Sequence, residues 1–245
     1  MKLLHLTHES AATNLAIDEA LLETAEATGN FPEVLRIWEP KHPLVVLGRS
    51  SPIEQEANLS YCRRENVNVL RRCSGGQSIV TGPGCLMYAV LLDYRQRPEL
   101  RMLDRAHHFV MRQMQQSIAS LGIDVEMQGT SDLTHQGRKF SGNALRCKRH
   151  WFVYHGTMIC DFDIDMIANC LGNPIRAPEY RAGRSHRDFL TQLPTSANEL
   201  TRAVVDHWGA AVELDQWPEE MANRLATEKY ANEEWISNVR WRKER

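Results

Sequence analysis

The sequence lacks the paired cysteines, long apolar runs and excess of one charge that mark several common protein classes. None of its six cysteines forms a C-x-x-C pair, which argues against a zinc ribbon or a thioredoxin-type motif. The first residues lack the apolar core of a signal peptide, and no window approaches the roughly 18 apolar residues of a membrane span. The net charge of -2 includes no basic excess that would favour nucleic acid. These absences predict a cytoplasmic protein with reduced thiols and with neither nucleic acid nor a membrane as a partner.

The order of the predicted elements favours one large domain. Apolar residues at helical spacing predict helices over residues 11–27, 58–65, 103–121, 165–171, 197–208 and 218–228. Short apolar runs predict strands over residues 34–38, 44–47, 67–70, 77–80, 85–92, 123–127, 139–144 and 151–160. Strands gathered in the middle of the chain, with helices between and after them, are typical of an α+β or mixed-sheet α/β fold.

A basic, glycine-rich turn stands between two of the predicted strands. It begins with Arg71 and Arg72 and contains the pair Gly75 and Gly76. Two adjacent glycines are also typical of an ordinary hairpin turn, and neither the G-x-x-x-x-G-K-[ST] nor the G-x-G-x-x-G phosphate motif is present. However, adjacent glycines let backbone N–H groups converge on an anion, and arginines supply matching charge. Because successive strand residues point to opposite faces, we expect one of the two arginines to face such a site.

A lone lysine, Lys139, precedes a run of small residues on a predicted strand. Such a lysine is often simply exposed, but Ser141, Gly142, Asn143 and Ala144 lack the bulk with which a strand normally packs. Glycine inside a strand often marks the close approach of a ligand or of another backbone. An ammonium group suits a carboxylate or a phosphate. The lysine and the basic turn together indicate a site that joins two anions, as carboxylate activation by ATP requires.

Two further polar segments lie near the lysine in the sequence. Asp132, in a Ser-Asp-Leu segment, is either part of a surface turn or a ligand for Mg²⁺, an ion that favours one or two carboxylates together with substrate phosphates. His155 precedes Gly156 and Thr157 in an apolar setting. A histidine in such a setting has either a structural or a catalytic role.

Together, and in this order, these segments resemble the lipoate–protein ligases, within the superfamily that includes the biotin ligases and the octanoyltransferases. The resemblance is carried by residues 14–20, 46–49, 71–76, 131–133, 138–144 and 155–157. It implies an α+β fold of the biotin/lipoate ligase catalytic-domain type, with a mixed central β-sheet flanked by helices. The implied activity is that of an ATP-dependent ligase, which activates lipoate or octanoate as acyl-AMP and transfers the acyl group to a lysine of a lipoyl carrier domain.

The resemblance also implies roles for individual residues. Lys139 is implied to be catalytic, contacting the carboxyl-derived oxygen and the phosphate and acting by orientation and electrostatic stabilisation. Asp132 is implied to lie near Mg²⁺. The residues implied to line the site for ATP and lipoate are Arg72, Gly75, Gly76, Gln77, Ser78, Ile79, Val80, Asp132, Lys139, Ser141, Gly142, Asn143, Ala144, His155, Gly156 and Thr157.

The same resemblance predicts the domain organisation and the partners. Residues 1–210 are expected to form the catalytic domain and residues 211–245 a short helical extension of it, without the accessory domain that many of the family's ligases carry. The implied partner is a lipoyl carrier domain of the 2-oxoacid dehydrogenase E2 or glycine cleavage H protein type. A ligase without the accessory domain either acts alone or needs a separate accessory subunit, and both alternatives stay open here.

Two substitutions depart from the family pattern. Gln77 stands where a third glycine is usual, so its side chain either narrows the pocket or hydrogen-bonds a ligand. Ser131 replaces the usual asparagine before Asp132, which puts a weaker oxygen donor near the proposed metal.

Other activities stay open at this point. An octanoyltransferase needs a cysteine whose thiolate is favoured by positive charge, and Cys170, after the His-Gly motif, is the loose candidate. The competing interpretation of Cys170 is a core helix cysteine. A non-catalytic binder of lipoyl proteins is another hypothesis, against which the presence of Lys139 argues. Biotin ligase fits less well, because its basic loop places glycines between the arginines.

Residues 176–187 are predicted to form a polar loop. They contain His186 and arginines at positions 176, 181, 184 and 187. The loop is either a solvated surface segment or a mobile one that closes over the adenylate or meets an acidic carrier domain. Since lipoyl domains tend to be acidic, a basic rim would steer their encounter with the site.

Overall fold

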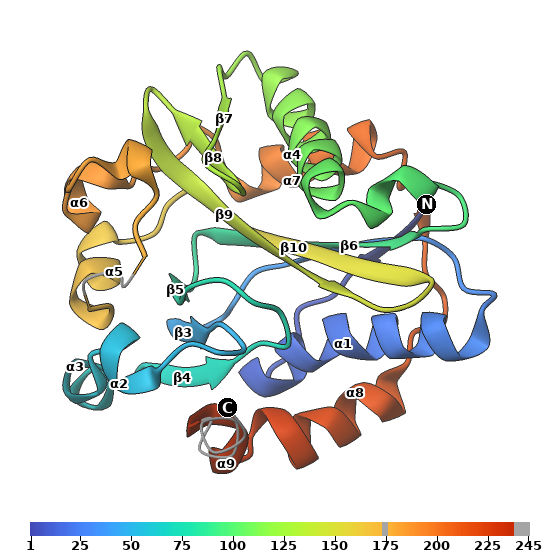
Figure 1. Ribbon diagram of the computed structural model, residues 1–245, viewed down its shortest axis with the longest axis horizontal. Helices are drawn as coiled ribbons and strands as arrows, with labels where there is room; N and C mark the ends of the chain where they lie inside the picture. The colour runs from blue at the N-terminus through green and yellow to red at the C-terminus, as the bar shows by residue number, and fades with distance from the viewer. Residues whose placement is uncertain (173–175, 238–245) are drawn as a thin grey trace.

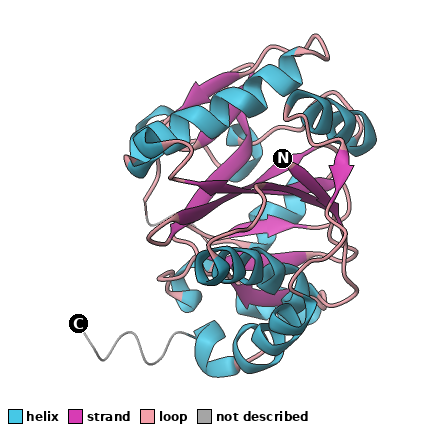
Figure 2. Ribbon diagram, turned by 90° about the vertical axis from the view of Figure 1, so that its right-hand side faces the viewer, coloured by secondary structure: helices cyan, strands magenta, loops and turns pink. Residues whose placement is uncertain are grey.

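The computed structural model describes residues 1–172 and 176–237, which form two β-sheets surrounded by helices (Figures 1 and 2). The main sheet has eight strands in the order β11-β1-β2-β6-β10-β9-β8-β7. These strands are β1 (Lys2–His5), β2 (Val34–Trp38), β6 (Cys85–Asp93), β7 (Glu126–Gln128), β8 (Asp132–His135), β9 (Arg138–Cys147), β10 (Trp151–Ile159) and β11 (Val212–Glu213). The pairs β11-β1 and β1-β2 are parallel and the others are antiparallel. The predicted α+β fold with a mixed central sheet is therefore confirmed.

Helices cover both faces of the main sheet. In Figure 1, α4 (Leu103–Ala119) and α7 (Ala197–His207) lie above it, while α1 (Ala11–Thr28) and α8 (Glu219–Leu225) lie below. The short helix η1 (Pro98–Arg101) leads into α4. Val110, Met114 and Ile118 recur at one-turn spacing along α4, and all three are fully buried. Burial on both faces explains why β6 and β10 are almost continuously apolar.

A three-stranded sheet lies beside the main one, with its strands in the order β4-β3-β5. They are β4 (Asn68–Arg71), β3 (Leu44–Leu47) and β5 (Ile79–Thr81). Short helices surround this sheet, namely α2 (Ile53–Glu56), α3 (Leu59–Arg64), α5 (Ile164–Cys170), η2 (Glu179–Arg181) and α6 (His186–Phe189). Val45, Val80 and Ile167 belong to one apolar cluster in this part of the molecule.

The C-terminal helices pack against α1 and β4. They are the π-helical turn η3 (Ala226–Tyr230) and α9 (Glu233–Ser237). Lys229 Nζ lies 2.7 Å from each carboxylate oxygen of Glu19, on α1. Trp235 donates its indole N–H to the carbonyl oxygen of Arg71 at 2.9 Å. The C-terminal helices are thus joined by specific contacts to α1 and to β4, the strand that leads into the basic turn.

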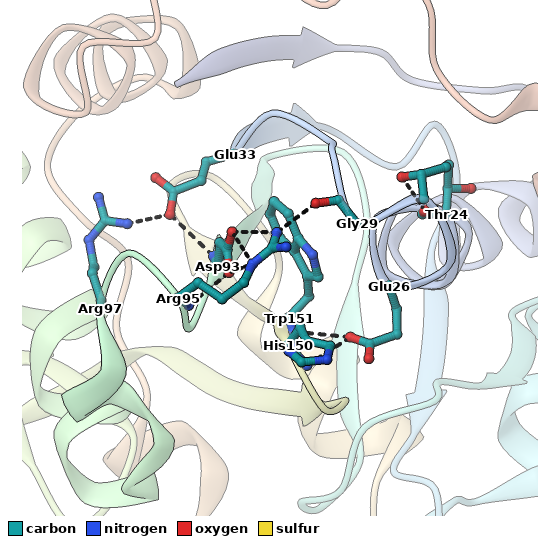
Figure 3. A network of polar contacts seen from close by, with 10 residues as sticks. Thr24, Glu26, Gly29, Glu33, Asp93, Arg95, Arg97, His150 and Trp151 are labelled. Carbon is teal, nitrogen blue, oxygen red and sulfur yellow. Dashed lines mark hydrogen bonds and ion pairs between the residues drawn. The ribbon is translucent and has the colours of Figure 1, made fainter.

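A polar network fastens the remote end of β6 and β10 to the loop after α1 (Figure 3). The Arg95 guanidinium binds Asp93 and donates to the carbonyl oxygen of Gly29 at 2.8 Å. Glu26 accepts from the backbone N–H groups of His150 and Trp151. The β-strands that line the candidate site are therefore held at their other end as well.

The structure departs from the sequence predictions in several segments. Strand β8 was not predicted, because its polar residues become a strand only by pairing with β7 and β9. The single polar loop predicted over residues 176–187 is wrong, since η2 and the start of α6 lie within it. β1, β11, α2 and α9 were not predicted either. Within the described residues, no helix is long and apolar enough to cross a membrane.

Candidate active site

A cavity of about 440 Å³ opens where β9, β10, the small sheet and the basic turn meet. Part of its wall is apolar and comes from Leu15, Trp38, Val46, Met87 and Ile159. Every residue predicted for the site lines this cavity except Gly75, whose side of the turn is exposed. Each of the six segments that carry the family resemblance contributes residues to the wall of this cavity. The binding roles of these residues remain predictions.

Lys139 is held at the cavity wall by a carboxylate. Its Nζ lies 2.8 Å from Oδ1 of Asp132, on the neighbouring strand β8. Gly142 pairs with Asp132 in the β8–β9 register, and a Cβ atom there would lie 2.9 Å from Lys139 Nζ. The glycine in this strand therefore makes room for the lysine side chain itself, which fixes where the ammonium group points.

Both oxygens of Asp132 have partners. Oδ1 faces the lysine, and Oδ2 accepts a hydrogen bond from the Tyr180 hydroxyl at 2.7 Å. The described residues contain no group of three or more His, Cys, Asp or Glu side chains arranged to hold a metal ion. Mg²⁺ bound directly at Asp132 would share the carboxylate with Lys139 and Tyr180 and would need further oxygens from the substrate. What these contacts show is a carboxylate that orients the lysine, and its metal role stays a prediction.

Asn143, on β9, explains why a glycine stands at position 156 on the neighbouring strand β10. Its Oδ1 accepts from the Tyr88 hydroxyl at 2.6 Å, and its Nδ2 donates to the carbonyl oxygen of Ser131 at 2.8 Å. Gly156 lies opposite Asn143 in the β9–β10 register, and a Cβ atom there would lie 1.8 Å from Asn143 Oδ1. Ser131 contributes its backbone to this contact, so the serine that replaces the family's asparagine leaves the contact intact.

Arg72 organises the basic turn from inside. Its Nε donates to Ser74 Oγ at 2.9 Å, and its guanidinium also donates to the carbonyl oxygens of Gly75 and Gln77. Gly76 has a φ of 86°, in the left-handed region that favours glycine. Arg71 points the other way, to the carbonyl oxygen of Ile236 in α9. The expectation that one of the two arginines faces the site is therefore confirmed. Burial lowers the pKa of Arg72 to about 10, which leaves it charged at neutral pH.

The turn continues into a contact that the sequence did not suggest. Glu56, in the short helix α2, accepts hydrogen bonds from the backbone N–H of Ser78 at 2.8 Å and from its hydroxyl at 2.6 Å. One N–H group of the turn is thus already paired with a carboxylate of the protein. Gln77 also lines the cavity, and its side-chain Nε2 is buried without a partner among the described residues. No motif marks Glu56, so only the tertiary contact identifies it.

His155 lies between two polar groups. Its Nδ1 is 2.9 Å from Asp18 Oδ2, and its Nε2 is 2.6 Å from Ser74 Oγ. Asp18 also pairs with the buried Arg36 at 2.6 Å. Burial by itself raises the pKa of Asp18, but Arg36 and His155 outweigh it and hold that pKa below its usual range. Asp18 was not predicted as a site residue, although it lies in the segment 14–20 on which the family resemblance depends.

The model of the lipoyl protein ligase A/B catalytic domain matches residues 10–207. The chain belongs to this family. It is 25% identical over 238 residues to a probable lipoate-protein ligase A of Mycoplasma pneumoniae, covering 91% of this chain and 67% of that protein. It is also 27% identical over 258 residues to the octanoyltransferase LipM of Carboxydothermus hydrogenoformans, covering 93% of this chain and 94% of that protein. The family of lipoate ligases and octanoyltransferases is thus established, and both activities occur among the relatives.

Solved structures show the same fold. A bi-partite lipoate protein ligase of Thermoplasma acidophilum, studied with its E2 lipoyl domain, superposes with a TM-score of 0.83 at 21% identity, covering 98% of this chain and 97% of that one. A lipoate-protein ligase A bound with ATP superposes with a TM-score of 0.75, also at 21% identity, and the match covers 97% of this chain and 98% of that one. These matches support the central sheet and its flanking helices as the catalytic-domain architecture of the lipoyl protein ligase family.

In this member of the family, the segment that begins at residue 176 packs onto the site. The Tyr180 hydroxyl reaches Asp132, and the buried Arg181 stacks over Phe189 with 4.9 Å from Cζ to the ring centre. Arg181 and Arg184 each donate to the other's carbonyl oxygen. These two arginines hold the segment together, and Arg176 and Arg187 are the exposed ones.

Cys170, the cysteine relevant to an octanoyltransferase, ends helix α5 and is fully buried. Burial raises the pKa of its thiol to about 12, so the thiolate is scarce at neutral pH. Its interpretation as a core cysteine is confirmed.

Proposed function

We propose that this chain is an ATP-dependent lipoate–protein ligase. The observation that carries the proposal is the ammonium group of Lys139, oriented by Asp132 at the wall of a cavity that also contains the basic turn. The apolar part of the cavity suits an acyl chain, and its polar end suits a carboxylate and phosphates. The lipoate-protein ligase A that binds ATP on this fold supports the nucleotide half of the proposal.

The proposed reaction has two balanced steps. A carboxylate oxygen of lipoate or octanoate attacks the α-phosphorus of ATP, and pyrophosphate leaves with the electron pair of the broken P–O bond. The amine of a carrier lysine then attacks the acyl carbon, releases AMP and loses a proton. Lys139 offsets the repulsion between carboxylate and phosphate in the first step, and it stabilises the oxygen that leaves with AMP in the second. Asp132 keeps the lysine side chain directed at that junction. Mg²⁺ is expected to accompany the ATP phosphates.

The deciding experiment is pyrophosphate release from Mg-ATP by the purified chain, with lipoate or octanoate and no carrier protein. We expect release that depends on the added acid. If no release occurs while the chain transfers octanoate from octanoyl-acyl carrier protein, the ligase proposal is wrong and the transferase alternative stands.

The octanoyltransferase alternative is favoured by the LipM relative, whose full length matches this chain. It requires a reactive cysteine, and the raised pKa and full burial of Cys170 oppose that role. Cys170→Ser is therefore expected to retain acyl transfer to within about a factor of two, because it removes no reactive thiolate. The measurement is transfer of octanoate to a carrier domain from both ATP plus octanoate and octanoyl-acyl carrier protein. A loss of more than about tenfold with the second donor alone would identify Cys170 as a nucleophile.

Gln77 is expected to limit the acyl end of the substrate. Gln77→Gly removes a side chain from the cavity wall and keeps the carbonyl oxygen that binds Arg72. We expect the ratio of kcat/KM for lipoate over octanoate to rise about three- to tenfold, because the bulkier dithiolane ring gains room. Pyrophosphate release with each acid measures this ratio. An unchanged ratio would place Gln77 away from the acyl chain.

The proposed partner is a lipoyl carrier domain of the E2 or glycine cleavage H protein type, and a separate accessory subunit is part of the proposal. The ligase of Thermoplasma acidophilum, a bi-partite enzyme with an E2 lipoyl domain as its partner, supports both points. Charge reversal at Arg187, which is exposed and does not line the cavity, is expected to raise the KM for an acidic carrier about three- to tenfold at low salt, with a smaller effect at high salt. Transfer to the carrier at two salt concentrations measures it, with the KM for ATP as the control. An unchanged carrier KM at low salt would exclude docking at this rim.

A further inference from the structure

A continuous line of hydrogen bonds joins helix α1 to the basic turn. Arg36 binds Asp18 Oδ1 at 2.6 Å, and Asp18 Oδ2 lies 2.9 Å from His155 Nδ1. His155 Nε2 is 2.6 Å from Ser74 Oγ, and that oxygen accepts from Arg72 Nε at 2.9 Å. Four of these five residues are buried, and the His155 side chain is 13% exposed at the cavity wall. The line therefore runs through the interior and ends at the turn.

One arrangement of protons satisfies every contact along this line. The Asp18 carboxylate only accepts, so His155 carries its proton on Nδ1 and leaves Nε2 as an acceptor. The Ser74 hydroxyl then donates to Nε2, and its lone pairs face the Nε–H of Arg72. With its Nε held by Ser74, Arg72 donates its remaining N–H groups to the carbonyl oxygens of Gly75 and Gln77. The tautomer of His155 thus sets the orientation of Arg72.

The order Ser74–His155–Asp18 has the hydrogen-bond pattern of a hydrolytic triad. Ser74 is nevertheless only 1% exposed, and it does not line the cavity. Its oxygen is also held by Arg72. A substrate carbonyl cannot approach such an oxygen, so a nucleophilic role does not fit the geometry.

We propose that His155 is a positioning residue which, with Asp18, fixes Ser74 and Arg72 and thereby the shape of the basic turn from Ser74 to Gln77. The consequence for ATP binding rests on the function proposed above. The effect on the turn itself does not, because it follows from contacts within the protein.

Asp18 is needed as a carboxylate in this arrangement. One of its oxygens is used by Arg36 and the other by His155. In Asp18→Asn a single carbonyl oxygen remains, and the buried Arg36 competes for it. The amide N–H₂ group then faces Nδ1 of His155 and favours the opposite tautomer, whose Nε2–H displaces the Ser74 proton. Asp18→Asn should therefore act like loss of the histidine, although it changes neither size nor shape.

Hydrogen exchange of the ligand-free protein tests the proposal. We expect the peptide over residues 72–80 to exchange about tenfold faster in His155→Ala and Ser74→Ala, since each removes about one buried hydrogen bond from the support of the turn. Asp18→Asn should accelerate exchange at least as much, because it also removes the carboxylate charge that pairs with the buried Arg36. His155→Gln, which keeps an amide near the position of Nε2, should lie closer to the wild type. The matched control is His107→Ala, which removes another partly buried histidine, bonded to Tyr154 on the face of the sheet that α4 covers. Exchange over residues 197–207, in α7, which contains none of the substituted positions, reports whether a variant is folded.

Two results would overturn the proposal. One is unchanged exchange of residues 72–80 in the folded Asp18→Asn and Ser74→Ala variants. The other is equal acceleration in His107→Ala, which would make the effect one of general stability.

The kinetic readout separates this proposal from the proposed function. In pyrophosphate release, the same three variants should raise the KM for ATP about tenfold, while kcat changes less than about threefold. If the wild type releases no pyrophosphate but the exchange pattern holds, the positioning role stands and the ligase assignment fails. If release is normal and the variants leave both exchange and the KM for ATP unchanged, the ligase assignment stands and the positioning role fails.

Discussion

Replacing Lys139 with alanine should lower kcat/KM for acyl-adenylate formation by about a hundred- to a thousandfold. A positive group fixed where charge develops contributes about 2.7–4 kcal/mol to the stability of a transition state, and no other lysine lines the cavity within the described residues. Asp132 keeps its bond from Tyr180 in this variant, so we expect the free energy of unfolding to change little. Pyrophosphate release and urea unfolding, measured on the same preparation, separate the two effects.

The matched control is Lys148→Ala. Lys148 has a side-chain exposure of 29%, against 25% for Lys139, and it also forms an ion pair, with Glu23 at 2.6 Å. It does not line the cavity, so its removal should leave pyrophosphate release near the wild-type rate. If Lys139→Ala kept more than about a third of wild-type activity, the catalytic role of the lysine would be wrong.

A single methyl group added at Gly156 should damage both the fold and the site. In Gly156→Ala the new Cβ atom would lie 1.8 Å from Asn143 Oδ1 and 2.8 Å from Tyr88 Cε1. The Tyr88 side chain is buried, and the Asn143 side chain is held by hydrogen bonds to β6 and to Ser131, so neither can retreat without losing contacts. Overpacking of this kind lowers the free energy of unfolding by about 1–3 kcal/mol, and each lost hydrogen bond adds about 1 kcal/mol.

Urea unfolding of Gly156→Ala measures this effect. Gly75→Ala is its control for stability, because a Cβ atom at Gly75 meets no atom within 4 Å. We expect little change in the unfolding free energy of the control. A loss of less than about 0.5 kcal/mol in Gly156→Ala would mean that Asn143 is able to move aside, and that close packing against Asn143 is not what requires a glycine at position 156.

Local signals in the sequence were sufficient for most of the fold. β2 and β3 have the predicted bounds, because each is a short, mainly apolar run: glutamates flank β2, and a proline and a glycine flank β3. α1 extends one residue beyond its prediction, and its signals are strong, with Ser10 capping its start and Gly29 ending it in the left-handed conformation. β8 lacked such a signal. Its polar residues are stabilised by pairing with strands on both sides, and a pattern within one segment does not reveal that pairing.

The sequence by itself determined the family, the basic turn, the lysine strand and part of the cavity lining, because motifs are properties of the local chain. Only the tertiary structure decided what these residues contact. It showed that Gly142 makes room for Lys139, that Arg72 is turned inward to the carbonyl oxygens of its own turn, and that Asp18 reaches His155 across 137 positions of the chain. Contacts of this kind depend on the packing of distant strands and helices, and the order of residues along any one segment does not encode them.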